Sequence, residues 1–182
     1  MKILYYDGDD QAKRKQVEAI ITQANISLIM VETDQGAATL AELLEGHGSN
    51  IKQKKLPPID LMVFEGFTDD AIMEISTALQ KESVSVARKC VVTKSNRSWQ
   101  FAQLLQEICE EQAYMNRMIQ CQSLLREVST YQENNYTKES WQKYEFAFMS
   151  GALLLQQEQA TKAQLDAVVE AIIHTRDHLI KK

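Results

Sequence analysis

Five polar residues are the candidates for ligand chemistry in this sequence: Asp7, Glu65, Thr93, Asn96 and Arg97. Three of them directly follow short apolar segments, and the other two come a few residues later. Two carboxylates, a hydroxyl, an amide and a guanidinium supply the donors and acceptors that a small polar ligand or an anion needs. These side chains make one site only if the fold brings the ends of the apolar segments together.

The first 110 residues alternate short apolar segments with amphipathic ones. Strands that are apolar throughout, separated by helices, predict a parallel sheet covered on both faces. We therefore expect an α/β domain with a four-stranded, flavodoxin-like sheet in the order 2-1-3-4. The predicted strands are residues 3–6, 26–31, 61–64 and 90–92.

In a parallel sheet, ligands bind at the carboxyl ends of the strands. That rule places four residues at one edge: Asp7, Glu32, Glu65 and Thr93. Asn96 or Ser95 is predicted to cap the helix that follows the last strand. The segment from Thr93 to Trp99 then has two interpretations. It is either a structural corner between strand and helix, or an anion or small-ligand site at a helix N-terminus with Arg97 assisting.

The second half of the sequence is helical. The apolar stripe changes phase near residue 110, so we expect two domains, 1–111 and 112–182. Thr137 is predicted to begin one helix, with Tyr136 packing on Trp141. Thr161 and Gln164 form a capping-box pattern that begins another. Short connections between these helices predict an antiparallel three-helix bundle.

Charge and cysteine content exclude some classes of function. The net charge is −5, and neither half is basic, which argues against a nucleic-acid partner. No apolar segment is long enough for a membrane span. The three cysteines fit no metal-binding pattern, and the spaced pair His174 and His178 has no third ligand, so we expect no metal and no cofactor. Unpaired cysteines and the acidic N-terminal segment favour a cytoplasmic protein.

Two motifs in residues 61–108 resemble a bacterial domain family of unknown function. The first is Gly66-Phe67-Thr68-Asp69-Asp70, and the second is Lys89-Cys90-Val91-Val92-Thr93-Lys94-Ser95-Asn96-Arg97-Ser98-Trp99. This resemblance implies no activity. The same half also resembles response-regulator receivers, through the acidic residues after the first strand and through Thr93 at the end of another. That resemblance implies a degenerate regulatory domain, with Glu65 in the position of the phosphorylated aspartate.

Residues 114–179 resemble the FIVAR module, a three-helix unit best known from bacterial surface proteins. The motifs that carry it are Tyr136-Thr137-Lys138-Glu139-Ser140-Trp141 and Ala160-Thr161-Lys162-Ala163-Gln164-Leu165-Asp166-Ala167. The resemblance implies a spacer or adhesion unit. The helix after Thr137 also carries apolar residues on more than one face, which favours docking on another protein.

No nucleophile–base pair and no phosphate-binding loop is evident, so we do not expect an enzyme. The sequence favours a non-enzymatic protein-interaction or scaffold module, binding a protein partner or a second copy of itself through the helical half. The alternative is a degenerate receiver-like or small-ligand-sensing domain that uses Asp7, Glu65, Thr93 and Asn96.

Overall fold

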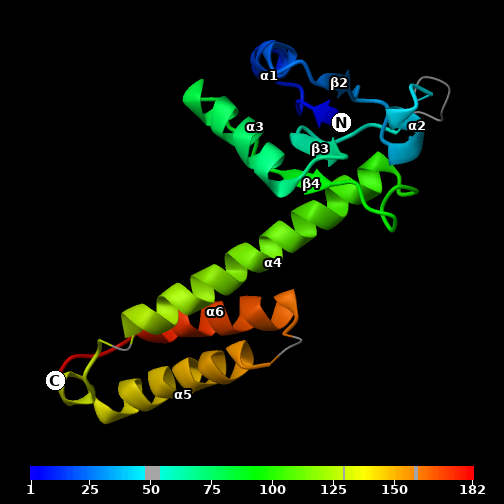
Figure 1. Cartoon of the computed structure of the whole chain (residues 1–182). Helices are drawn as coiled ribbons and strands as arrows, with labels where there is room; N and C mark the ends of the chain where they lie inside the picture. Colours follow the sequence, from blue (N-terminus) through cyan, green and yellow to red (C-terminus); the bar gives the residue numbers. More distant parts are fainter. Residues whose placement is uncertain (48–53, 129, 158–159) are drawn as a thin grey trace. The chain divides into compact units, whose positions relative to one another are not determined.

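The computed structural model describes residues 1–47, 54–128, 130–157 and 160–182 (Figure 1). The chain divides into two compact units, an N-terminal unit of Met1–Ile108 and a C-terminal unit of Cys109–Lys182. Helix α4, Phe101–Val128, contributes residues to both. Within the described ranges, every helix is too short or too polar to cross a membrane.

The N-terminal unit contains a four-stranded sheet in the order β2-β1-β3-β4. Its strands are β1 (Lys2–Tyr6), β2 (Ser27–Met30), β3 (Leu61–Glu65) and β4 (Lys89–Val91). The predicted number and order of strands are confirmed. The pairs β1–β2 and β3–β4 are parallel, but β1 and β3 are antiparallel, with Lys2 opposite Glu65. The prediction of a parallel sheet is therefore wrong for the central pair.

The path of the chain between β2 and β3 explains this direction. Helix α2 (Leu40–Leu44) ends near the start of β1, because Lys2 Nζ donates to the Leu44 carbonyl at 2.7 Å. Residues 54–56, the returning segment, lie beside the residues that follow β2, because Leu56 N–H donates to the Thr33 carbonyl at 2.7 Å. The next strand, β3, therefore starts with Leu61 opposite Tyr6 at the end of β1 and runs back against β1. A parallel strand would need a crossover that finishes at the other edge.

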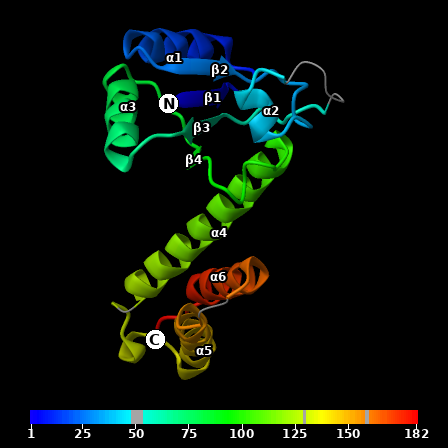
Figure 2. The same ribbon diagram turned by 45° about the vertical axis from the view of Figure 1, so that its right-hand side comes forward.

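Helices α1 (Gln11–Gln23) and α3 (Asp69–Lys81) pack on one face of the sheet. Their buried residues and the strand residues on that face form one core: Val17, Ile21, Ile75 and Leu79 from the helices, and Ile3, Tyr5, Met62 and Phe64 from the strands. The Tyr6 ring faces the other way and meets the Phe101 ring edge-on at 6.2 Å. Figure 2 shows α3 and α2 on opposite sides of the strands.

Local capping interactions fix where the first helices begin. The Thr68 hydroxyl accepts from Ala71 N–H at 3.3 Å and starts α3, which confirms that predicted cap. Asp10 caps α1 in the same way, by accepting from Lys13 N–H at 3.0 Å. The prediction that Ser95 or Asn96 starts the helix after β4 is wrong, because α4 begins at Phe101 and a separate turn precedes it.

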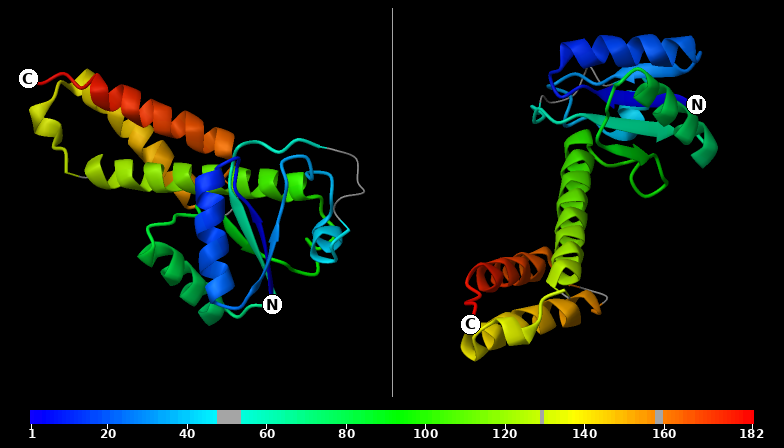
Figure 3. Two further views of the ribbon diagram at one scale, coloured as in Figure 1. Left: turned by 90° about the horizontal axis from the view of Figure 1, so that it is seen from above. Right: turned by 90° about the vertical axis from the view of Figure 1, so that its left-hand side faces the viewer.

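The C-terminal unit is helical, with α5 (Lys138–Leu155) and α6 (Lys162–Asp177) lying side by side (Figure 3). A short 3-10 helix, Glu133–Asn135, precedes α5. The later part of α4 shares their hydrophobic core through Cys121 and Leu124, which pack with Tyr144, Ala147, Leu165, Val169 and Ile172. Gly151 allows close packing there, since an added Cβ would lie 2.9 Å from Ile172 Cδ1.

Of the two helix starts predicted in this unit, the start of α6 has the predicted cap and the start of α5 does not. The Thr161–Gln164 capping box is confirmed, with both reciprocal hydrogen bonds present. The Tyr136 and Trp141 rings stack at 6.0 Å, as predicted. Thr137 does precede α5, but its hydroxyl contacts the Ser140 hydroxyl at 2.9 Å and makes no bond to a backbone N–H of the helix.

Candidate functional site

The five candidate residues lie at two opposite edges of the sheet. Asp7 follows the last residue of β1, whereas Glu65 pairs with Lys2, the first residue of that strand. With a rise of about 3.3 Å per residue, five residues of strand separate the two carboxylates by roughly 16 Å. The prediction that parallel strand ends collect Asp7 and Glu65 at one edge is therefore wrong. Glu65, Thr93, Asn96 and Arg97 do lie together.

At the Glu65 edge, the Arg97 guanidinium is shared between two carboxylates. Its Nη1 forms an ion pair with Glu65 Oε1, and its Nη2 lies 3.8 Å from Glu45 Oε1, at the end of α2. The Arg97 side chain is 44% exposed, so solvent screens these pairs. With two carboxylates beside the guanidinium, this edge is a poor site for an anion.

The Thr93–Asn96 corner satisfies its own polar groups. Thr93 N–H donates to Asn96 Oδ1 at 2.7 Å, and Asn96 Nδ2 donates to the Val91 carbonyl at 3.0 Å. Asn96 N–H in turn donates to the Thr93 hydroxyl at 3.2 Å. Asn96 is buried. Of the two interpretations, these bonds favour the structural corner, because a buried amide already bonded on both sides is not available to a ligand.

At the other edge, Asp7 belongs to a charged network around Arg14. Its Oδ1 accepts from Asp9 N–H at 3.0 Å, and its Oδ2 lies 3.6 Å from Arg14 Nη1. Arg14 Nη2 also donates to Glu32 Oε1 at 2.5 Å. This hydrogen bond lowers the pKa of Glu32 below its usual value and raises the pKa of Arg14. Glu32 and Asp7 therefore do lie at one edge, as predicted.

Asp60 joins this edge because β3 runs against β1. It lies just before β3 and is buried, with its Oδ2 3.0 Å from Lys13 Nζ. Arg88, just before β4, brings Nη1 to 3.7 Å from Asp60 Oδ1. Burial raises the pKa of Tyr5, and the carboxylates of Asp60 and Asp7 raise it further. Sequence reasoning missed Asp60, because a residue before a strand is assigned to the opposite edge when the sheet is taken as parallel.

The arrangement at the Asp7 edge is that of a structural charge network. Its acidic and basic side chains pair with one another, and in the described ranges no group of three or more His, Cys, Asp or Glu side chains could hold a metal ion. Gly8 packs tightly here, because an added Cβ would lie 2.9 Å from the backbone nitrogens of Ile59 and Asp60. Through Lys13 and Arg14, the network ties α1 to Asp60 before β3 and to Asp7 after β1.

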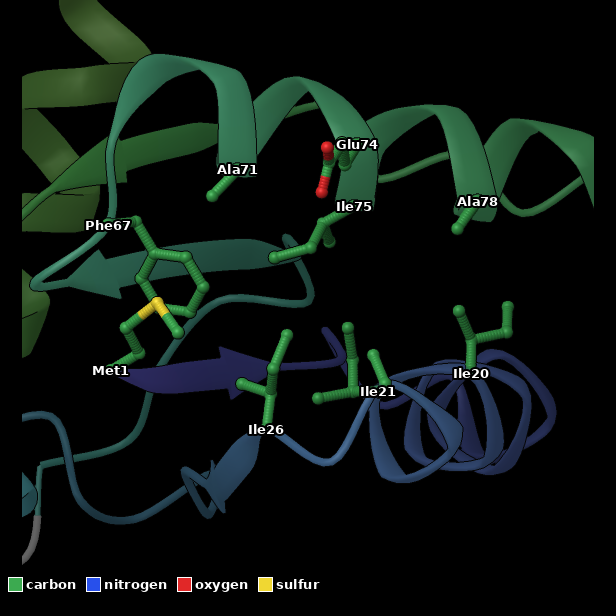
Figure 4. A pocket seen from close by; sticks show the side chains of 10 residues that line it. Met1, Ile20, Ile21, Ile26, Phe67, Ala71, Glu74, Ile75 and Ala78 are labelled. Atoms are coloured by element: carbon green, nitrogen blue, oxygen red, sulfur yellow. The ribbon is translucent and has the colours of Figure 1, made fainter.

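A groove in the N-terminal unit was not foreseen from the sequence (Figure 4). It lies between α1 and α3, has a volume of about 360 Å³, and is lined by Met1, Ile20, Ile21, Ala24, Ile26, Phe67, Ala71, Glu74, Ile75 and Ala78. Figure 4 shows the α3 side chains along one side, with Ile20 and Ile21 on the other. The spacing Ala71, Ile75 and Ala78 on one helix face is the sequence signal that marks it.

The histidines and cysteines show no arrangement for metal or redox chemistry. His174 and His178 stack ring on ring at 4.2 Å, and His178 Nδ1 hydrogen-bonds to the His174 carbonyl at 2.7 Å. All three cysteines are free. Burial raises the pKa of Cys90 to about 12, and it also raises the pKa of Cys121. A thiol that holds its proton is a poor nucleophile and a poor metal ligand.

Comparison with known proteins matches a segment of the chain, residues 60–115, to a family model. No curated protein matches the chain, and no solved structure matches it. The matched segment is less than a third of the chain, and it includes β3, α3, β4 and the first part of α4. It contains Glu65, Thr93, Asn96 and Arg97 but not Asp7. Residues 60–115 match a family described as a domain of unknown function, DUF3783.

Proposed function

We propose that the protein is a non-enzymatic protein-interaction module whose contact surface is one exposed face of α5. The observation that carries the proposal is the exposure of Phe146, Met149 and Leu153, which are 76%, 51% and 57% accessible. Their spacing of three and four residues places them in a row on a single helix face. Single exposed apolar residues are common, but a row of three large ones on one helix marks an interaction surface.

The occupant that we propose for this face is a second copy of the chain. A two-fold axis between Met149 and Ser150 would pair two antiparallel α5 helices and place Phe146 of one copy against Leu153 of the other. Such a self-complementary contact is what a two-fold dimer requires. Gln142 and Gln156 flank the row at its two ends, so the pairing brings no like charges together.

The fold of the C-terminal unit supports a scaffold role. We propose that it is a FIVAR-like antiparallel three-helix bundle, joined to the α/β domain near residue 111. The shared core of α4, α5 and α6, the stacked Tyr136–Trp141 pair and the Thr161 capping box support this assignment. The compact units Met1–Ile108 and Cys109–Lys182 support the two-domain division.

We also propose a bacterial, cytoplasmic protein with neither nucleic acid nor membrane among its partners. The free cysteines support a reducing compartment. The net charge of −5 disfavours phosphate-rich partners. The degenerate-receiver alternative receives no support from the opposite placement of Asp7 and Glu65.

The proposal is tested by measuring the mass of the full chain in solution, from low micromolar to several hundred micromolar concentration, by sedimentation velocity. We expect a concentration-dependent dimer that the double variant F146S/L153S abolishes. Met73→Ser is the matched control, because Met73 is 69% exposed but lies alone on α3. A strict monomer at every concentration contradicts the self-association, and so does a dimer that survives the double substitution.

A further inference from the structure

The groove between α1 and α3 has the features of a binding site. Ile21 and Ile75 are almost fully buried and form its floor. Ile20, Ile26 and Phe67 pack against the core but keep part of their surface accessible. A volume of about 360 Å³ falls at the low end of the range for small-molecule pockets. The groove therefore suits a small molecule with an apolar body.

Small side chains on the facing helices create the space. Ala71 and Ala78 lie two turns apart on α3, on the same face as Ile75, and Ala24 lies at the end of α1. Larger side chains at these positions would fill the groove. At the end drawn on the left of Figure 4, Met1 and Phe67 lie near each other and close the groove.

Glu74 supplies the negative charge of the groove. It is the one ionisable side chain in the lining, and in the described part of the chain it has neither an ion-pair partner nor a hydrogen-bond partner. It lies between Ala71 and Ala78 along α3 and is exposed, so its carboxylate stands at the rim. The α-amino group of Met1 lies beside Gly66.

We propose that this groove binds a small cationic amphiphile, with its hydrocarbon part between α1 and α3 and its ammonium group paired with Glu74. Burial of the hydrocarbon part supplies most of the affinity, because the lining is almost entirely apolar. The carboxylate supplies charge selectivity. Since Glu74 is exposed, we expect the amine to bind only about two- to fivefold more tightly than a neutral molecule of equal length.

The test uses three probes of equal chain length: octylamine, octanol and octanoate. Each is titrated into the full-length protein while the methyl groups of Ile20, Ile26, Ala71 and Ala78 are followed by NMR. We expect saturable shifts of these methyl signals with octylamine, weaker binding of octanol, and the weakest binding of octanoate. Added salt should reduce the preference for the amine.

Two pairs of variants separate the site from general effects. Ala78→Leu fills the groove and should weaken octylamine binding at least about tenfold, whereas Ala163→Leu makes the same change at an exposed site on α6. Glu74→Gln should bind octylamine no better than octanol, with Glu170→Gln as its control. Thermal unfolding by circular dichroism checks that each variant folds. The proposal is overturned if octanoate binds as tightly as octylamine. It is also overturned if the octylamine-induced shifts spread equally over the C-terminal unit, or if both Ala78→Leu and Glu74→Gln bind octylamine as tightly as the wild type.

Discussion

Glu65 is paired with Lys2 across the antiparallel strands β1 and β3, so it stands at the opposite end of β1 from Asp7. This relationship separates residues that a parallel sheet would collect at one edge. The antiparallel direction also brings Asp60 and Arg88 to the Asp7 edge. There Asp60 forms ion pairs with Lys13 and Arg88, and its carboxylate raises the pKa of Tyr5. Asp60 therefore links α1, through Lys13, to the segment before β4, through Arg88.

Replacing Asp60 should destabilise the protein. Asp60 is buried between Lys13 and Arg88, so Asp60→Asn leaves two cations without their carboxylate. Because Lys13 keeps 27% of its surface exposed, we expect a loss of about 2–3 kcal/mol in the free energy of unfolding, less than for a fully buried pair. Urea denaturation measures it. Glu139→Gln breaks the exposed pair with Lys143 and should cause no measurable loss; equal effects of the two changes would argue against the buried network.

The Thr93–Asn96 corner should prove structural. Asn96→Ala removes an acceptor for Thr93 N–H and a donor to the Val91 carbonyl, and we expect it to cost about 1–3 kcal/mol of unfolding free energy. Arg97→Gln breaks only partly exposed ion pairs and should cost less than about 1 kcal/mol. Chemical denaturation of the two variants compares them directly. A larger loss for Arg97→Gln than for Asn96→Ala would contradict the assignment.

Gly36 should tolerate no side chain. A Cβ there would lie 2.6 Å from the Lys54 carbonyl oxygen, which belongs to the returning segment that sets the direction of β3. We expect Gly36→Ala to lower the free energy of unfolding by about 1–3 kcal/mol.

Gly151→Ala is the contrasting change. Its Cβ would meet the tip of the Ile172 side chain, which can move, and alanine favours the helix by about 1 kcal/mol. We expect little net change in melting temperature. If Gly36→Ala melts like the wild-type protein, the returning segment does not pack as described.

Cys90 should make stability fall at alkaline pH. In the folded protein burial raises its pKa to about 12, whereas an unfolded cysteine titrates near 8.5. Between these pH values the unfolded chain has lost the thiol proton and the folded protein has kept it. The free energy of unfolding is therefore unaffected below the lower value and decreases as the pH rises above it. Measured between about pH 8.5 and 10, below the tyrosine range, Cys90→Ala should show a shallower decrease than the wild type; identical slopes would contradict the burial of this thiol.

The sequence predicts those parts of the fold that are encoded locally. Apolar segments locate all four strands to within a few residues, and hydroxyl side chains mark the starts of α3 and α6 at Thr68 and Thr161. These features depend on side chains next to each other in the chain, so periodicity and capping patterns reveal them.

The direction of β3 depends on contacts that sequence patterns do not show. The hydrogen bonds from Lys54 and Leu56 to Asp34 and Thr33 form between two irregular segments, which carry no hydrophobic period. Once that direction is taken as parallel, Asp60 is assigned to the wrong edge and the charged network is missed.

The groove also depends on two helices that are distant in sequence. The exposed row on α5 is visible as a pattern, but its exposure follows only from the packing of the unit.

The direction of β3 is tested most directly by isotope-edited NOESY spectra of the full-length protein. The antiparallel pair predicts cross-strand contacts between backbone protons of Lys2 and Glu65, Leu4 and Val63, and Tyr6 and Leu61. Contacts of Lys2 with Leu61 and of Tyr6 with Glu65 would instead show a parallel pair and would contradict the separation of Asp7 from Glu65.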